Sequence, residues 1–189
     1  GQAGLGPVVT RMTAEIKASE EHSIEIHSFY KDVTHCYKLV VVVIAFISMI
    51  VYSCYLHWVV PQGYALSGIL VWAMNTVGYA IRFYAMRNLY ILNGYGELGW
   101  DKVLQIITTI LTNIGFFLVL SQGMGFLGLG VVFLLASIIF LLISRALLKH
   151  FVKIARFSNS PRNKNRIRSI FSQSRQIFIL NLSSFLVLN

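Results

Sequence analysis

Two long stretches of this sequence contain no charged side chain. Neither residues 39–81 nor residues 103–144 include a Lys, Arg, Asp or Glu, so the sixteen Lys and Arg residues fall into three blocks, at residues 11–38, 82–102 and 145–175. Each uncharged stretch is about twice the roughly 20 residues that cross a bilayer as a helix. A soluble domain has no reason to separate its charges in this way, so the pattern predicts a membrane protein.

Acidic residues are scarce, and none follows Asp101. Charged residues make up 12% of the 189-residue chain and hydrophobic residues 56%, whereas an ordinary soluble domain is about 25% charged. Too little charge remains to cover a globular surface. The net charge of +9 indicates anionic phospholipids or an anionic substrate as partners rather than nucleic acid, because nucleic-acid-binding proteins carry their basic patch on a soluble fold.

The charge pattern also predicts a topology. If each uncharged stretch crosses the membrane twice, all three basic blocks face one compartment, and the positive-inside bias makes that compartment the cytoplasm. We therefore predict an all-α integral membrane protein, a polytopic helix bundle with outer turns at residues 61–64 and 121–130. The expected elements are an interfacial helix within residues 8–32 and four spans at about residues 39–60, 64–87, 100–120 and 125–144.

The two ends of the sequence indicate a piece of a longer protein. Residues 145–175 hold nine basic residues and no acidic residue, which predicts a basic cytoplasmic connector after the fourth span. Residues 176–189 then begin an apolar run that is too short to cross a bilayer. The chain also begins without Met. We therefore expect residues 1–175 to be one partial transmembrane half and residues 176–189 to be the start of the next span.

No motif in the sequence predicts catalysis, a cofactor or a metal. Residues 94–99 match the glycine pattern of dinucleotide-binding loops, but the acidic residue that would bind the ribose is absent after Asp101. We interpret these glycines as a turn between two spans. The five histidines are scattered, without the spacing of metal ligands. We expect a protein that is not an enzyme and that binds neither a cofactor nor a metal.

Polar residues inside the expected spans are the better functional signal. Uncompensated polar groups in hydrocarbon are costly, so these side chains should face other helices or a wet cavity. Two readings stay open, because Asn, Gln and Thr also join helices to one another, and Arg82 could extend its charge to the cytoplasmic headgroups. The residues concerned are Asn75, Thr76, Gln105, Thr109, Thr112 and Asn113, together with Arg82 at the end of the second span.

Several segments resemble one family of transporters. Residues 4–15 (GLGPVVTRMTAE) resemble the cytoplasmic end of the second helix in O-antigen and capsule polysaccharide flippases of the multidrug/oligosaccharidyl-lipid/polysaccharide exporter superfamily. Residues 89–107, the glycine-rich residues 123–130 and the basic segment ending in Ser172-Gln173-Ser174-Arg175-Gln176 are similar to the region from the fourth to the seventh helix. The resemblance covers most of the chain and implies part of the N-terminal half of a two-half transporter.

The resemblance implies a function. Such flippases move undecaprenyl-diphosphate-linked oligosaccharide across the bacterial cytoplasmic membrane by alternating access, and the polysaccharide polymerase machinery is an implied partner. A diphosphate requires Arg or Lys and polar donors. The residues that we expect along the substrate path are Arg11, Asn75, Arg82, Gln105, Thr109 and Asn113.

Other functions remain open. A drug or cation antiporter of the same superfamily is disfavoured because the expected spans contain no Asp or Glu to carry a coupling proton. A non-transporting membrane subunit and a membrane enzyme are the remaining alternatives.

Overall fold

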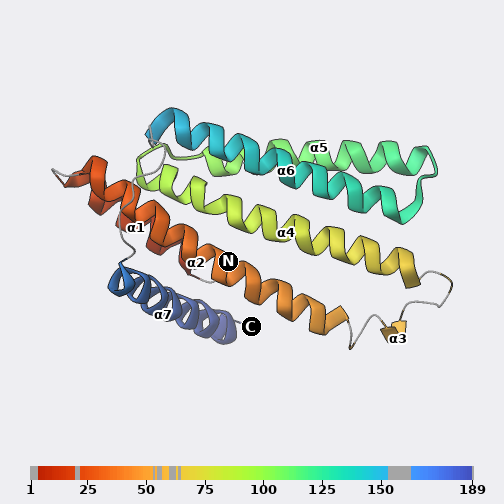
Figure 1. Cartoon of the computed structure of the whole chain (residues 1–189), viewed down its shortest axis with the longest axis horizontal. Helices are drawn as coiled ribbons and strands as arrows, with labels where there is room; N and C mark the ends of the chain where they lie inside the picture. Colours follow the sequence, from red (N-terminus) through yellow and green to blue (C-terminus); the bar gives the residue numbers. More distant parts are fainter. Residues whose placement is uncertain are drawn as a thin grey trace. The chain divides into compact units, whose positions relative to one another are not determined.

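The computed structural model describes residues 4–19, 22–52, 54, 57–59, 63, 65–152 and 163–188. These residues form α-helices and no β-strand, which confirms the predicted all-α fold. Within the described part of the chain, seven helices follow one another (Figure 1): α1 (Leu5–Ala18), α2 (His22–Val51), α3 (His57–Val59), α4 (Ala65–Gly94), α5 (Trp100–Ser121), α6 (Gly125–Val152) and α7 (Lys164–Leu188).

The chain divides into two compact units, and the division follows the distribution of charge. Unit 2 consists of Lys38–Ala85 and Lys102–Arg145, which are the two uncharged stretches with a few residues added at their ends. Unit 1 consists of Gly1–Tyr37, Met86–Asp101 and Ala146–Asn189, so it contains residues from all three basic blocks.

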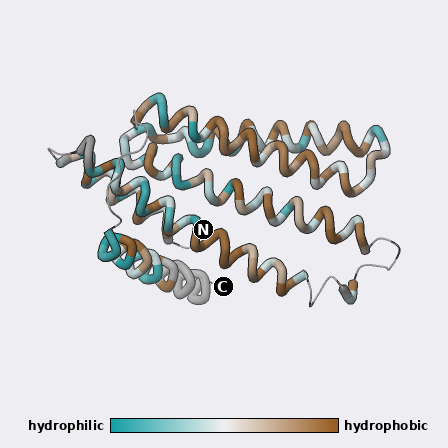
Figure 2. Tube along the Cα trace, in the orientation of Figure 1, coloured by the Kyte–Doolittle hydropathy of each residue, from teal (hydrophilic) through white to brown (hydrophobic). Residues whose placement is uncertain are grey.

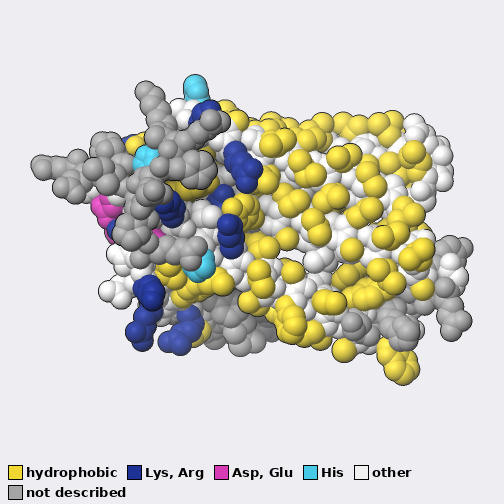
Figure 3. Space-filling view, viewed as in Figure 1, with side chains coloured by type: hydrophobic (Ala, Val, Ile, Leu, Met, Phe, Trp, Pro, Cys, Tyr) yellow, Lys and Arg dark blue, Asp and Glu magenta, His cyan; other side chains and the backbone are white. Residues whose placement is uncertain are grey.

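Three helices are long and apolar enough to cross a membrane, judged by length and composition. They are the segment Glu25–Val51 of α2, together with α5 and α6. Many of their large apolar side chains are exposed, among them Phe46, Phe117 and Leu142. Figure 2 shows how strongly hydrophobic α5 and α6 are, and Figure 3 shows hydrophobic side chains covering much of the surface over the helices of unit 2. Soluble monomers rarely expose apolar surface on this scale, so lipid is the natural environment of unit 2.

Helix α4 is less apolar than these three. It is 30 residues long, but it is not among the helices that are apolar enough to cross a membrane. Asn75, Thr76 and Arg82 lower its mean hydropathy. The prediction of four spans is therefore supported for three of them.

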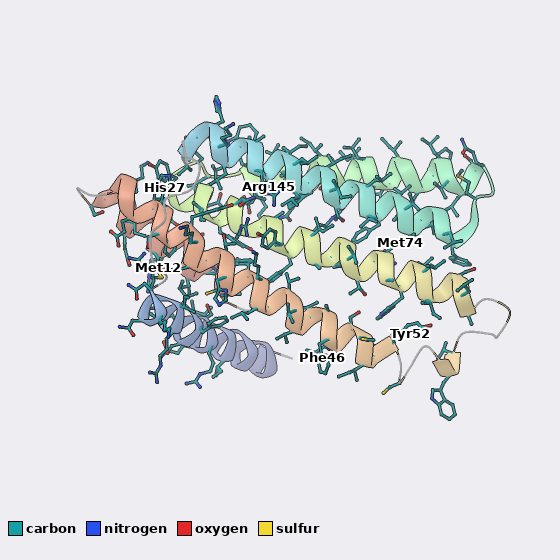
Figure 4. The ribbon with its side chains drawn as sticks, viewed as in Figure 1. Met12, His27, Phe46, Tyr52, Met74 and Arg145 are labelled. Carbon is teal, nitrogen blue, oxygen red and sulfur yellow. The ribbon has the colours of Figure 1, made fainter. Side chains whose placement is uncertain are left out.

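The polar residues of α4 bond to other helices of unit 2. The hydroxyl oxygens of Thr76 and of Ser48 on α2 are 2.7 Å apart, and Trp72 Nε1 donates a hydrogen bond to the Ser48 carbonyl at 3.2 Å. Glycine allows close packing on the other side, where a Cβ at Gly130 of α6 would lie 3.1 Å from the Met74 sulfur of α4 (Figure 4). Such contacts offset the lower hydropathy of α4.

Several predicted helix limits were wrong. The predicted division between an interfacial helix within residues 8–32 and a first span at residues 39–60 lies elsewhere: α1 ends at Ala18, and α2 runs without interruption from His22 to Val51. The glycine-rich turn is shorter than predicted, because the residues from Gly125 onward already belong to α6. The basic segment is largely helical, since α6 continues to Val152 and α7 begins at Lys164. Of the other predicted outer turn, residues 61, 62 and 64 lie outside the described residues.

In unit 1, glycines allow α1 to pack closely on the end of α4. A Cβ at Gly6 would lie 2.5 Å from the Tyr90 ring, and a Cβ at Gly94 would lie 2.4 Å from the Thr10 carbonyl oxygen. The Thr10 hydroxyl donates to the Tyr90 carbonyl at 3.2 Å across the same contact. Any larger side chain at Gly6 or Gly94 would force the two helices apart.

Ionic contacts join the beginning of α7 to α2 in unit 1. The side chain of Asn163 caps α7 by accepting hydrogen bonds from the backbone N–H groups of Asn165 and Arg166 at 3.1 and 3.2 Å. Arg166 forms an ion pair with Glu25 at 2.8 Å, and the backbone N–H of Asn163 donates to the Asp32 carboxylate at 3.3 Å. Asp32 is only 1% exposed. A carboxylate at this position also interacts favourably with the N-terminal end of the α7 dipole.

Candidate functional site

Arg82 lies among three helices of unit 2. It extends from α4, where it is half-buried. Its Nε donates a hydrogen bond to Ser137 Oγ of α6 at 3.2 Å, and its Nη2 donates to Thr112 Oγ1 of α5 at 3.2 Å. A guanidinium has five N–H donors, and hydrogen bonds to the described residues use two of them.

The two hydroxyl groups are oriented to accept these hydrogen bonds. Thr112 Oγ1 donates its proton to the Thr108 carbonyl at 2.6 Å, and Ser137 Oγ donates to the Phe133 carbonyl at 2.7 Å. Each oxygen therefore presents a lone pair to Arg82. Ser137 is completely buried and Thr112 nearly so, which keeps bulk water from competing for these bonds.

The ring of Phe133 lies beneath the guanidinium. The Arg82 Cζ is 4.7 Å from the ring centroid, a distance at which a cation is attracted to the face of an aromatic ring. Gly78 makes room for this ring, since a Cβ there would approach it to 2.7 Å, and the Tyr79 ring flanks it at 4.7 Å between centroids. Phe133 therefore limits the positions that the Arg82 head can occupy.

Each of the three helices contributes a pair of residues one turn apart. Residues at i and i+4 share a helix face, and the pairs are Gly78 and Arg82 on α4, Thr108 and Thr112 on α5, and Phe133 and Ser137 on α6.

Our sequence reasoning did not select Ser137 or Phe133. One signal was available, because Ser137 is the only side chain between residues 126 and 143 that carries a hydrogen-bonding group.

No carboxylate among the described residues balances the charge of Arg82. The two segments of unit 2 contain four basic residues (Lys38, Arg82, Lys102 and Arg145) and no acidic residue. Among the described residues, no ion pair involves Arg82. The site is thus a cation held by neutral oxygens and an aromatic face, with donors left for an anion. Carboxylates and phosphates fit a guanidinium particularly well, because they accept two parallel N–H hydrogen bonds.

The other predicted site residues of unit 2 differ in their burial. Asn75 and Gln105 are half-buried, whereas Thr109 and Asn113 are exposed on α5. Thr112 and Asn113 are neighbours in sequence but lie about 100° apart around the helix, so the side that holds Arg82 and the side that carries Asn113 are different. Asn113 is exposed, so the described helices do not bury it. Thr76 joins α4 to α2, which is the helix-joining role that the sequence left open.

Arg11 has a different setting, in unit 1. Its side chain is exposed, its Nε lies 3.3 Å from Glu15 Oε1, and its Nη2 donates to Gln173 Oε1 at 2.7 Å. The charge of Arg11 is therefore balanced within its own helix, in contrast to that of Arg82.

Gly96 and Gly99 lie in a turn between α4 and α5, as predicted, whereas Gly94 is the last residue of α4. Gly96 and Gly99 both have φ +97, a left-handed conformation that glycine adopts without the steric cost of a Cβ. The Lys17 ammonium donates to the Tyr95 carbonyl at 2.5 Å and lies 4.8 Å from the Tyr95 ring centroid. This lysine satisfies a carbonyl group just beyond the end of α4.

The described structure is thus that of an α-helical protein with three helices suited to crossing a membrane and a partly buried arginine that lacks an acidic partner. Comparison with models of protein families, with curated proteins and with solved structures finds no match.

Proposed function

We propose that this protein is a transporter that moves undecaprenyl-diphosphate-linked oligosaccharide across the bacterial cytoplasmic membrane by alternating access, and that Arg82 binds the diphosphate. The observation that carries the proposal is the setting of Arg82. Unit 2 is apolar and holds no acidic residue, yet Arg82 is half-buried among its helices with donors to spare. Ionisable residues at membrane depth are costly and usually serve ions, protons or substrates.

The chemistry of the site suits a diphosphate. Neutral hydroxyl oxygens are weaker partners for a guanidinium than charged phosphate oxygens, because a phosphate carries the opposite charge and can accept two parallel N–H hydrogen bonds. An incoming phosphate can therefore occupy the free donors of Arg82 or displace Thr112 and Ser137. The lipid chain of such a substrate can remain in the bilayer while its headgroup enters the bundle. The basic residues of unit 1 would raise the local concentration of anionic headgroups.

The substrate class comes from the resemblance of the sequence to polysaccharide flippases, and the Arg82 site supports an anionic headgroup. A proton-coupled antiporter is disfavoured because unit 2 has no Asp or Glu to carry the proton. The competing interpretation of Arg82 is structural. In that case its hydrogen bonds to α5 and α6 only hold the bundle together.

Substitutions at Arg82 test the proposal through export of surface polysaccharide. The variants would be expressed at matched protein levels in cells whose export depends on this protein. Arg82→Gln should reduce export about 10- to 100-fold, the equivalent of one lost charge-assisted contact. Export by Arg82→Lys should lie between that of Arg82→Gln and that of wild type. Lysine keeps the charge but lacks the planar guanidinium group that donates two parallel hydrogen bonds. The matched control is Arg145→Gln, which removes the same charge from an exposed position of unit 2.

A second pair of substitutions separates the charge from the structural role. Thr112→Val and Ser137→Ala together remove the hydrogen bonds that Arg82 donates to α5 and α6, and they leave its charge in place. If Arg82 acts on the substrate, this double variant should export far better than Arg82→Gln. Equal losses in both proteins, or full export by Arg82→Gln, would show that Arg82 is not a substrate-binding residue.

A further inference from the structure

The guanidinium of Arg82 can present two N–H groups in parallel along two of its edges. One edge is formed by Nε and Nη2, and the other is formed by Nη1 and Nη2. Ser137 Oγ accepts from Nε at 3.2 Å, and Thr112 Oγ1 accepts from Nη2 at 3.2 Å. Hydroxyl groups from two helices therefore engage the edge of Nε and Nη2. We call the other edge, of Nη1 and Nη2, the terminal edge of Arg82.

The terminal edge keeps enough donors for one anionic group. Nη1 forms no hydrogen bond with another described residue, and Thr112 uses one of the two N–H groups of Nη2. Of the N–H groups that remain, one from each nitrogen can point in the same direction, and two parallel donors match two oxygens of a single phosphate. The last N–H of Nη1 is left alone, so it cannot form a second bidentate contact.

The edge that the hydroxyl groups engage is closed to a phosphate. Ser137 is completely buried, and its hydroxyl is oriented by the hydrogen bond that it donates to the Phe133 carbonyl at 2.7 Å. The Phe133 ring lies against the guanidinium, with Arg82 Cζ 4.7 Å from its centroid. A phosphate that leaves these contacts in place therefore meets Arg82 along the terminal edge.

The other basic residues of unit 2 are not part of the site. On α6, Arg145 follows Ser137 by eight residues, which is about 12 Å along the helix at 1.5 Å per residue. On α5, Lys102 precedes Thr112 by ten residues, or about 15 Å. Lys38 is exposed on α2, and none of the described hydrogen bonds of the site comes from that helix. One cation is thus present where a diphosphate has two charged groups.

We infer that Arg82 binds a single phosphate of the lipid headgroup through its terminal edge. The inference rests on the proposed function for the identity of the lipid. The bidentate contact is then the same for a lipid monophosphate and for a lipid diphosphate, and the second phosphate of the diphosphate makes no contact with Arg82. Undecaprenyl phosphate is therefore a ligand of this site as well.

Binding of two lipids to the purified protein in phosphatidylcholine nanodiscs tests this inference. Undecaprenyl phosphate and undecaprenyl diphosphate are each measured with wild type, Arg82→Gln and Arg82→Lys. Arg82→Gln should weaken the binding of both lipids about 10- to 100-fold. The two losses should agree to within about twofold, as expected for changes that do not interact. Arg82→Lys should weaken both lipids equally and less severely, because lysine keeps the charge but lacks an edge of parallel donors.

The comparison of the two lipids separates this inference from the proposed function. A loss about tenfold greater for the diphosphate would show that Arg82 contacts both phosphates, which would overturn the inference and leave the proposed function in place. Unchanged binding of both lipids by Arg82→Gln would contradict the proposed function itself. Phosphatidylglycerol is the competitor, because it also presents one phosphate. If it displaced undecaprenyl phosphate at equal concentration, an ordinary membrane lipid would supply the phosphate, and the proposed function would fail while the single-phosphate site stood.

Discussion

In unit 1 a buried carboxylate lies close to a basic side chain, whereas in unit 2 a half-buried arginine is held by hydroxyl groups and an aromatic ring. Asp32 is almost completely buried and lies 3.8 Å from Arg166, which also pairs with Glu25. Arg82 has Thr112 and Ser137 instead. An ion pair neutralises both partners, while a hydroxyl satisfies a donor without cancelling its charge. The charges of Asp32 and Arg166 therefore stabilise the packing of unit 1, whereas the charge of Arg82 in unit 2 remains available for an anion.

The turn between α5 and α6 should face the outside of the cell, and the end of α6 should face the cytoplasm. This predicts an all-or-none difference in thiol labelling between the two positions. Gln122, between α5 and α6, and Lys149, near the end of α6, are both exposed. A single cysteine at position 122, without Cys36 and Cys54, should react in whole cells with a thiol reagent that does not cross membranes. A cysteine at position 149 should react only after the membrane is opened. The reverse pattern would contradict the predicted cytoplasmic position of the basic blocks.

Removing the buried carboxylate of unit 1 should have the largest effect on stability. Asp32→Ala leaves Arg166 with one acidic partner fewer and removes the acceptor for the Asn163 N–H. Breaking a buried ion pair costs about 3–5 kcal/mol, which for a chain of this length lowers the melting temperature by about 6–20 °C. Thermal unfolding of the detergent-solubilised protein measures this change.

The exposed ion pair in the same unit is the control for that measurement. Both members of the pair Arg11 and Glu15 are more than half exposed, and exposed pairs contribute about 0–1 kcal/mol. Glu15→Gln should therefore shift the melting temperature by no more than about 4 °C. If Asp32→Ala were as mild as Glu15→Gln, the carboxylate of Asp32 would not be important for holding α7 to α2.

The sequence was sufficient to predict the helical fold and the separation of charge, because both follow from composition along the chain. The uncharged stretches correspond closely to unit 2, and the turn at Gly96 and Gly99 follows from local backbone preference. The limits of α2 and α7 were wrong because a polar sequence can continue a helix that tertiary contacts stabilise, as Asp32 and Arg166 do.

The composition of the Arg82 site could not be predicted in the same way. Which side of α5 faces Arg82 depends on the rotation of one helix against another, and α5 carries polar residues on more than one side. Thr112 bonds to Arg82, while its neighbour Asn113 is exposed. Ser137 was missed because a single hydroxyl in an apolar helix normally bonds to its own backbone, and its second role is visible only when Arg82 is placed beside it.

Binding of undecaprenyl diphosphate to the purified protein in lipid nanodiscs tests the central role of Arg82 most directly. Wild type and Arg145→Gln should bind this lipid with equal affinity, and Arg82→Gln should bind it about 10- to 100-fold more weakly, as expected for the loss of one charge-assisted contact. Equal affinity in all three proteins would contradict the assignment of Arg82 to the diphosphate.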